Sequence, residues 1–294
     1  MPTIRECLRK VAGRFDAARL DQPNMLARSL VAHTVGRARE WVLAHDEEEL
    51  TASQITQLEG YVTRIMAHEP LAYVVRQRAF YGMNLFVDDR VLIPRPETEL
   101  LVELVCEKTV RLAGLAAGQP VHILEIGTGS GAAIIAIARE LPHVSMLGTD
   151  VSANALEVAQ LNAENQGVAH RLVLVRSNLL EDLEQLALDQ VTILIANLPY
   201  IAPAEIAALQ SEIVNHEPHV ALDGGGADGL ELIRTLLSQI KLRCTNGRLR
   251  AVYLEHGALQ GPAALAAARV VFSDTVPRTV KDLAGLDRVL AIEF

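Results

Sequence analysis

Apolar residues recur every three or four positions through residues 1–70, a spacing that places them on one face of a helix. Pro23 follows Asp21 where a first helical turn would begin, and Thr51 is a helix-capping residue before another such run. These signals predict a small helical bundle, with Trp41 and the acidic run 46–49 between its helices. The repeated positions are Ile4, Leu8, Val11, Phe15, Leu26, Leu30, His33, Leu50, Ile55, Leu58, Val62, Ile65 and Met66. With no polar cluster of its own, the bundle is either purely structural or a docking surface for a substrate.

The pattern changes after Pro70. Residues 79–94 place aromatic and β-branched side chains in near alternation around Gly82 and the pair Asp88 and Asp89, which predicts a β-hairpin. A helix is expected over residues 97–112, because Pro96 stands just before its first turn.

From residue 121 onward, short apolar runs alternate with helical patterns. Strands are expected at 121–126, 145–150, 171–175 and 191–197, and helices at 131–142 and 154–168, ended by Pro142 and Gly167. Strands that are apolar on both faces belong in a mostly parallel sheet covered by helices. We therefore predict a doubly wound α/β fold that binds its ligand at the carboxyl ends of the strands.

Composition narrows the function classes. The chain has 294 residues, a formal net charge of −9 and 4% aromatic residues, so a basic surface for nucleic acid is not expected. Its three cysteines, Cys7, Cys106 and Cys244, are too scattered for a disulfide framework or a metal site. No run reaches the ~18 apolar residues of a membrane span. We expect a soluble, cytoplasmic protein without a metal.

A glycine-rich turn, EIGTGSG, follows the first strand of this region. Gly127, Gly129 and Gly131 allow a sharp turn and close approach to a ligand at a helix N-terminus, although such turns also serve dinucleotides or tight packing alone. Asp150, about 20 residues further on, is placed to accept hydrogen bonds from ribose hydroxyls. The GxGxG spacing and the acidic Glu125 favour a cationic adenosine cofactor, S-adenosylmethionine, over a pyrophosphate.

The tetrapeptide Asn197-Leu198-Pro199-Tyr200 ends the 191–197 strand. The side-chain carbonyl of Asn197 and the backbone carbonyl of Leu198 can each accept one hydrogen from a planar NH₂ group, which would orient a weak amide nucleophile for methyl transfer. Pro199 stiffens the loop, and Tyr200 can pack against the amide or the methyl donor. Alone, the tetrapeptide also fits a strand-ending turn with a buried tyrosine; in this fold, after EIGTGSG and Asp150, the amide-binding interpretation is favoured.

Several motifs in one order resemble a known family, the peptide chain release factor glutamine N5-methyltransferases of the HemK family. They are LIPRPETELLVE (92–103), LEIGTGSG (124–131), DVS (150–152), NLPYI (197–201), HEPHVALDGGGADGL (216–230), EHGALQG (255–261) and VKDLAGLDRVL (280–290). The likeness spans essentially the whole chain. It implies a Rossmann-like class I methyltransferase with a seven-stranded, mostly parallel sheet and an N-terminal helical domain joined to it by a β-hairpin.

The resemblance also implies domains at 1–75 (release factor docking), 76–95 (hairpin linker) and 96–294 (methyltransferase). The substrate would be the glutamine of the Gly-Gly-Gln motif in a release factor. The implied cofactor-binding residues are Glu125, Gly127, Thr128, Gly129, Gly131, Asp150, Val151, Asn178 and Asn197. The implied catalytic and substrate-binding residues are Asn197, Leu198, Pro199 and Tyr200, joined by Arg95, Glu97 and Thr98 as a wall of the cleft.

Two positions depart from the family pattern. Leu198 replaces the first proline of the usual tetrapeptide but keeps the backbone carbonyl, so activity should survive. Asn178 stands where many methyltransferases place an acidic residue for the adenine amino group, and its carbonyl can still accept that bond. Arg95 to Thr98 also fit an ordinary interdomain turn that begins a helix. His216, His256 and the other histidines have no metal-ligand spacing and are interpreted as structural or surface residues.

Rival functions remain at this point. One is glutamine methylation of a ribosomal protein, against which the sequence RPETE at residues 95–99 argues. Another is N6-adenine methylation of DNA or RNA, which uses the same Asn-x-Pro-Tyr geometry but is disfavoured by the acidic charge. A third is a binding scaffold without turnover, for which Leu198 is the sole hint. We expect no stable nucleic-acid binding, no membrane association and a monomer.

Overall fold

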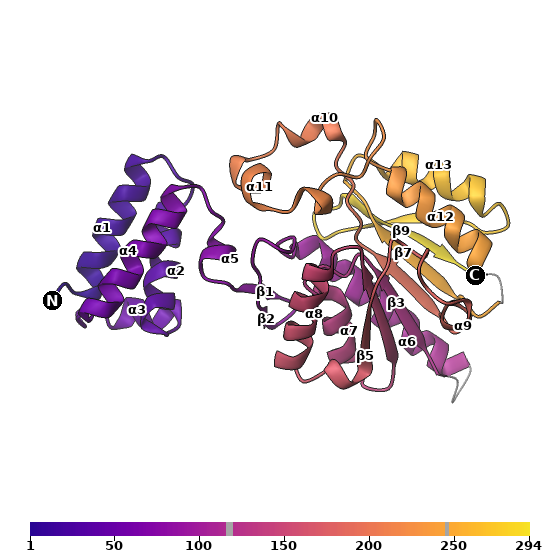
Figure 1. Ribbon diagram of the computed structural model, residues 1–294, viewed down its shortest axis with the longest axis horizontal. Helices are drawn as coiled ribbons and strands as arrows, with labels where there is room; N and C mark the ends of the chain where they lie inside the picture. The colour runs from indigo at the N-terminus through magenta and orange to yellow at the C-terminus, as the bar shows by residue number, and fades with distance from the viewer. Residues whose placement is uncertain (116–119, 245–246) are drawn as a thin grey trace. The chain divides into compact units, whose positions relative to one another are not determined.

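The computed structural model describes residues 1–115, 120–244 and 247–294 (Figure 1). The chain divides into two compact units: residues 1–77 with 211–216, and residues 78–210 with 217–294. Within the described ranges, no helix is both long and apolar enough to cross a bilayer.

The helical unit confirms the predicted bundle. Its helices are α1 (Ile4–Ala17), α2 (Pro23–Val35), α3 (Arg39–Ala44), α4 (Ala52–Met66) and α5 (Leu71–Val74), with α11 (Ser211–His216) grouped in the same unit. The Thr3 and Thr51 side chains each accept a hydrogen bond from the backbone three residues on, and Glu6 and Gln54 complete the capping boxes. Their apolar faces meet in one core around Phe15, which is fully buried.

Two details of the bundle differ from the sequence prediction. Trp41 lies within α3 rather than between helices, because the short run 39–44 is itself helical and buries Val42. His33 is exposed, while its neighbours Val31, Ala32 and Thr34 are buried. The apolar face of α2 therefore runs through Leu30 and Thr34, and a periodic pattern that includes His33 is shifted by one position.

The predicted hairpin is present but short. Strands β1 (Arg78–Phe80) and β2 (Met83–Leu85) pair antiparallel around Tyr81 and Gly82, which both have positive φ. The helix predicted from residue 97 begins later. Residues Pro96–Thr98 form a 3₁₀ turn, η1, and α6 runs over Glu99–Leu115. Such 3₁₀ turns are frequent at the N-termini of α-helices, and here the α-helical hydrogen-bond pattern starts one turn later than predicted.

The second unit contains the seven-stranded sheet that the family resemblance implied. Its spatial order is β5-β4-β3-β6-β7-β9-β8; β9 runs antiparallel to β7 and β8, and the other pairings are parallel. The strands are β3 (His122–Ile126), β4 (Ser145–Asp150), β5 (Leu172–Arg176), β6 (Ile193–Ala196), β7 (Ala251–Glu255), β8 (Arg278–Lys281) and β9 (Asp287–Glu293). The four strands predicted from apolar runs are β3 to β6, which confirms the doubly wound prediction.

Helices cover both faces of this sheet. The longer ones are α6, α7 (Ala132–Glu140), α8 (Ala153–Asn165), α12 (Glu231–Arg243) and α13 (Gly261–Val271). Short helical segments are η2 (Ala169–Arg171), α9 (Gln185–Leu188), α10 (Pro203–Ile206) and η3 (His219–Ala221). Side chains alternate between the two faces of the sheet, so each face has its own core. Ile123 of β3 packs with α6 and α7, whereas Leu124 packs with α12 and α13. The helices α12 and α13 lie side by side in Figure 1.

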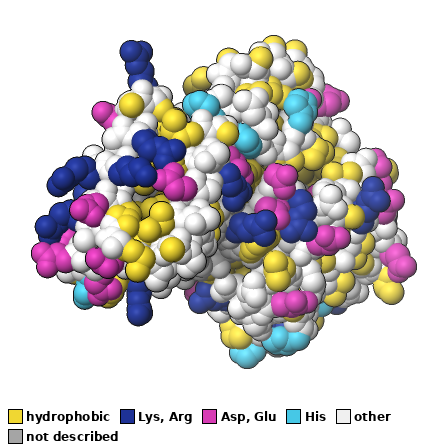
Figure 2. All heavy atoms as spheres, turned by 60° about the vertical axis from the view of Figure 1, so that its left-hand side comes forward, with side chains coloured by type: hydrophobic (Ala, Val, Ile, Leu, Met, Phe, Trp, Pro, Cys, Tyr) yellow, Lys and Arg dark blue, Asp and Glu magenta, His cyan; other side chains and the backbone are white. Residues whose placement is uncertain are grey.

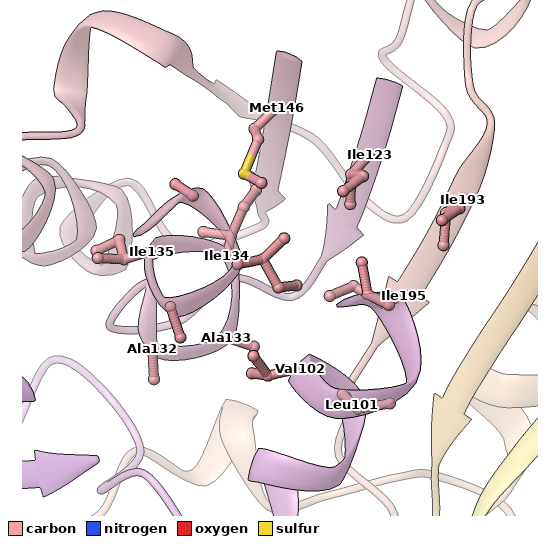
Figure 3. Packing of buried hydrophobic residues seen from close by; sticks show 14 of the residues in the cluster. Leu101, Val102, Ile123, Ala132, Ala133, Ile134, Ile135, Met146, Ile193 and Ile195 are labelled. Atoms are coloured by element: carbon pink, nitrogen blue, oxygen red, sulfur yellow. The ribbon is translucent and has the colours of Figure 1, made fainter. Parts of the chain in front are cut away.

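Tight packing under α7 holds the start of that helix against the sheet. Figure 3 shows Leu101 and Val102 of α6 beside the Ala-Ile run of α7, with Ile123 and Ile195 of the sheet nearby. These side chains are almost completely buried. The loop that precedes α7 is therefore anchored at both ends, by β3 and by this core.

Candidate active site

A cavity of about 610 Å³ opens at the carboxyl ends of β3, β4 and β6. Its volume is in the range of sites that hold a small-molecule cofactor. The residues expected at the site that line it are Arg95, Thr98, Glu125, Gly127, Thr128, Gly129, Asp150, Val151, Asn178, Asn197, Leu198 and Pro199. Of the residues that the structure describes, Glu97, Gly131 and Tyr200 were expected at the site but stand outside this lining.

The glycine-rich loop turns sharply between β3 and α7. Gly127, Gly129 and Gly131 all have positive φ, a conformation that other residues adopt at a cost. A Cβ atom on Gly127 would lie 3.2 Å from Leu198 Cδ2, and one on Gly131 would lie 2.7 Å from Ile135 Cδ1. Gly131 therefore supports the site by close packing under the loop rather than by lining the cavity.

Asp150 ties this loop to the end of β4. Its Oδ2 atom accepts a hydrogen bond from the Gly129 amide at 2.8 Å, and its Oδ1 atom accepts one from the Ser152 amide at 2.9 Å. Burial raises the pKa of Asp150, and these amide donors oppose the rise. Each oxygen keeps a further lone pair for a ligand hydroxyl in the cavity.

Glu125 is buried at the base of the cavity, and its Oε2 atom has no hydrogen-bond partner within the described residues. Burial raises the pKa of Glu125 to about 8; the Thr128 hydroxyl and the Ile134 amide oppose this rise, and the nearby charge of Asp150 adds to it. A buried carboxyl with one oxygen that lacks a partner, and that lines a cavity, suits a cation, whose charge would restore ionisation. This suits the cationic end of S-adenosylmethionine.

Asn197 follows the last residue of β6 and lies beside Thr98. Its Nδ2 atom donates to the Thr98 hydroxyl at 3.0 Å, which leaves Oδ1 as the free acceptor of the side chain. Thr98 is buried at the end of η1. The Leu198 side chain, 5% exposed, packs in the core between the sheet and α12. Leu198 thus anchors the loop by burial at a position where the family has proline.

The segment 222–229 holds the tetrapeptide from behind. Ile201 donates its amide to the Leu222 carbonyl and accepts from the Gly224 amide. A Cβ atom on Gly224 would lie 2.7 Å from the Pro199 carbonyl oxygen, and one on Gly229 would lie 2.1 Å from that of Tyr200. Glycine at these two positions is what allows the two loops to pack backbone against backbone.

The wall formed by residues 92–98 is held by Glu217. Its side chain is almost fully buried and accepts from the Ile93 amide at 3.2 Å and from Arg95 Nη2 at 2.6 Å. Arg95 and Pro218 line the cavity, so the RPET and HEPH motifs form one side of it. Asn178, on another side, is exposed; its Nδ2 atom donates to Glu181, which leaves its carbonyl as the acceptor.

Three supporting residues were not assigned a role from sequence. Asn162 of α8 is buried and donates from Nδ2 to the Ser130 and Phe86 carbonyls, which joins the glycine-rich loop to the hairpin segment. Gln260 donates to the Tyr200 carbonyl at 2.7 Å. Glu255, at the end of β7, is fully buried. Each contacts groups more than 30 positions away in sequence, so local sequence patterns do not reveal its role. The motif EHGALQG marked the region of Glu255 and Gln260 without assigning either residue a role.

Comparison with known proteins places this geometry in a family. Residues 6–75 match the family model described as PrmC N-terminal domain, and residues 123–216 match Methyltransferase domain. The release factor glutamine methyltransferase of Moorella thermoacetica is 36% identical over 97% of this chain and 96% of its own length. That of Bradyrhizobium diazoefficiens is 33% identical over 98% of this chain and 94% of its own length.

This chain belongs to the release factor glutamine methyltransferase family. It is a methyltransferase that uses S-adenosylmethionine as its cofactor. Among solved structures, the N-terminal domain of human METTL16 in complex with SAH has a TM-score of 0.53 at 14% identity, covering 90% of this chain and 94% of that one. At that identity the likeness shows the shared fold.

Proposed function

We propose that this methyltransferase methylates the side-chain amide nitrogen, N5, of the glutamine in the Gly-Gly-Gln motif of a peptide chain release factor. The observation that carries the proposal is the orientation of Asn197. Its NH₂ group donates to Thr98 at 3.0 Å, so its carbonyl oxygen is the atom available to accept a hydrogen bond in the cavity. The curated relatives named release factor glutamine methyltransferase support the choice of substrate.

An amide nitrogen is a weak nucleophile, because its lone pair is delocalised into the carbonyl group. Two acceptors, Asn197 Oδ1 and the Leu198 carbonyl oxygen, would bind the two hydrogens of the glutamine NH₂ and orient its lone pair. S-adenosylmethionine supplies an electrophilic methyl group on a sulfonium centre. When bound, the cofactor would give its methyl group to the amide nitrogen and keep the electron pair of its carbon–sulfur bond, and the nitrogen would lose one proton to water.

The cofactor-binding residues are proposed on the same footing. Glu125 would pair with the cationic end of the cofactor, since its buried Oε2 atom has no partner in the described part of the chain. Asp150 and Val151 would bind the ribose side, with Gly127, Thr128 and Gly129 along the backbone and Asn178 toward the adenine amino group. Gly131 would act through packing.

We further propose that residues 1–75 dock the release factor, that 76–95 link the two parts, and that 96–294 carry the chemistry. Three ion pairs of the first part join Arg5 with Asp46, Arg14 with Glu59, and Arg64 with Glu69. On the face in Figure 2, Lys and Arg side chains are interspersed with Asp and Glu. This mixed surface suits a protein partner better than a phosphate backbone.

The test is incubation with methyl-labelled S-adenosylmethionine and, in separate reactions, a release factor, its Gly-Gly-Gln variant with alanine for glutamine, a ribosomal protein and duplex DNA. We expect label on the unmodified release factor and none on the alanine variant. Label on the ribosomal protein or DNA in place of the release factor, or equal label on the alanine variant, would overturn the proposal.

A further inference from the structure

A buried carboxyl group lies behind the proposed amide clamp. Ala196 of β6 is in register with Leu254 of β7, so Asn197 and Glu255 are the next residues on these neighbouring parallel strands. By the alternation of side chains, they lie on the same side of the sheet as Ile195 and Tyr253, which belong to the core under α6. Thr98, just before α6, lies on that same side and accepts the hydrogen bond from Asn197.

Glu255 is 0% exposed. Neither of its carboxyl oxygens has a completed hydrogen bond within the described chain, yet the hydroxyl groups of Thr98 and Tyr200 lie near enough to lower its pKa. Burial is the larger effect and raises the pKa of Glu255 to about 7. A buried carboxyl with unpaired oxygens is costly unless the neighbouring hydroxyls serve it as donors.

The direction of hydrogen bonding follows from the inventory of donors. Thr98 has one hydroxyl proton and accepts from Asn197 through its oxygen, so its own proton is free to be donated. The ionised carboxylate of Glu255 can only accept hydrogen bonds, and it is the acceptor next to the Thr98 hydroxyl. Tyr200 stays protonated, because burial raises its pKa to about 12, and it can donate to the same carboxylate.

We propose that Glu255 is a positioning residue that acts through the Thr98 hydroxyl to set which atom of the Asn197 amide faces the substrate. This rests on the proposed function of Asn197 as an amide clamp. Ionised Glu255 accepts a hydrogen bond from the Thr98 hydroxyl, Thr98 accepts one from Asn197 Nδ2, and Asn197 Oδ1 is left for the substrate. Protonated Glu255 can instead donate to the Thr98 hydroxyl, which then donates to Asn197 Oδ1. The Asn197 amide is then turned so that its own NH₂ group faces the NH₂ group of the substrate, and two donors cannot bind each other.

Charged groups around the Glu255 carboxyl shift its pKa in opposite directions. Arg288 lowers the pKa of Glu255 and Glu97 raises it. Arg95 and Glu97 act on the adjoining Tyr200. The imidazole of His256, next in sequence, is buried and its pKa is lowered, so it adds no charge near neutrality. The productive form is the ionised one, so activity should rise with pH through about 7.

The test compares Thr98→Ser, which keeps the hydroxyl, with Thr98→Val, which removes it at similar volume. Thr98→Val should lower kcat by roughly 10- to 100-fold while cofactor affinity stays within a few fold, and Thr98→Ser should restore most of the rate. Thr109→Val is the matched control. Thr109 lies in α6 and is buried, as Thr98 is, but its hydroxyl has no partner in the described residues. Thr109→Val should leave kcat unchanged.

Glu255→Gln supplies the second readout. The wild-type rate should show an inflection near pH 7, and the variant should lack it. Equal rates for Thr98→Val and Thr98→Ser, or a wild-type pH profile in Glu255→Gln, would overturn the positioning role. If Glu255→Gln does not fold, the Thr98 pair decides alone. Failure of the wild-type enzyme to label the release factor would instead contradict the proposed function, so the two failures are distinguishable.

Discussion

Gln260 is joined to Tyr200 by a hydrogen bond from its Nε2 atom to the Tyr200 carbonyl oxygen at 2.7 Å. The same Nε2 atom donates to the Asp228 carbonyl, also at 2.7 Å, and Oε1 accepts from the Gly257 amide. One side chain thus connects the tetrapeptide loop, the segment 222–229 and the turn after β7. The tetrapeptide, which lines the cavity through Asn197, Leu198 and Pro199, is thus held by a residue that does not itself line it.

Gln260→Ala should therefore loosen the tetrapeptide loop. We expect a loss of about 1–3 kcal/mol in the free energy of unfolding, because two carbonyl groups lose their donor, and a fall in kcat larger than any change in cofactor affinity. Gln166→Ala is the matched control, since half-buried Gln166 also donates to a carbonyl, that of Asn84. Denaturant unfolding and steady-state kinetics check both. Equal kcat values for the two variants would show that the loop needs no such support.

Glu125 predicts a pH dependence of stability in the cofactor-free protein. Its folded pKa, about 8, lies above the ordinary value of 4.5, so the folded state binds more protons than the unfolded chain between these values. The free energy of unfolding should fall as pH rises through this window. Glu125→Gln should weaken that dependence and be more stable than wild type at pH 8, by on the order of 1 kcal/mol or more. Glu255 contributes in the same direction in both proteins.

The same group predicts a proton release on cofactor binding. A cation beside Glu125 favours its ionised form, so binding at pH 7 should release a proton. Calorimetry in buffers of different ionisation enthalpy measures this directly. Glu125→Gln should bind the cofactor more weakly and release less. A wild-type affinity with unchanged proton release would place the cationic end of the cofactor elsewhere.

Alanine substitutions at Gly131 and Gly167 separate the cost of backbone strain from the cost of a packing clash. Both have positive φ, so alanine at either position costs about 1 kcal/mol for the left-handed conformation. Only at Gly131 does the added Cβ meet another side chain, at 2.7 Å from Ile135 Cδ1; at Gly167 nothing lies within 4 Å. Gly131→Ala should cost about 1–3 kcal/mol more than Gly167→Ala in urea unfolding. Equal losses would mean that the loop relaxes freely.

The strands were predictable from sequence because their apolar runs end at polar or glycine residues. β4 begins and ends where SMLGTD does, and β3, β5 and β6 differ from prediction by one or two residues. Local periodicity does not separate a 3₁₀ turn from a helix, which is why α6 was placed too early. Nor does it show that Trp41 lies in a helix of six residues.

The cavity lining was largely predictable because parallel strands bring their carboxyl ends to one edge. Glu125 is the second-to-last residue of β3, Asp150 ends β4 and Asn197 directly follows β6, so strand order suffices to bring them together. The supporting residues Asn162, Glu255 and Gln260 depend on partners distant in sequence. An acidic residue that closes the apolar run AVYLE was the one local signal for Glu255.

Asp150 offers a complementary prediction about the cofactor. Asp150→Asn keeps the shape of the side chain but replaces one acceptor oxygen with a donor, which disrupts both the Gly129 amide bond and the proposed ribose bonds. Cofactor affinity should fall by roughly 10- to 100-fold, with a smaller effect on the rate at saturation. Isothermal titration and saturation kinetics check the split. A loss confined to kcat would assign Asp150 to the chemical step.

The central claim is that Asn197 Oδ1 holds the substrate amide. The most direct measurement is the single-turnover rate of methyl transfer to a release factor by Asn197→Ala, with exposed Asn154→Ala as the matched control. We expect Asn197→Ala to lose about 100-fold or more in rate while its cofactor dissociation constant stays within a few fold of wild type, and Asn154→Ala to match wild type. A wild-type single-turnover rate in Asn197→Ala would contradict the amide clamp.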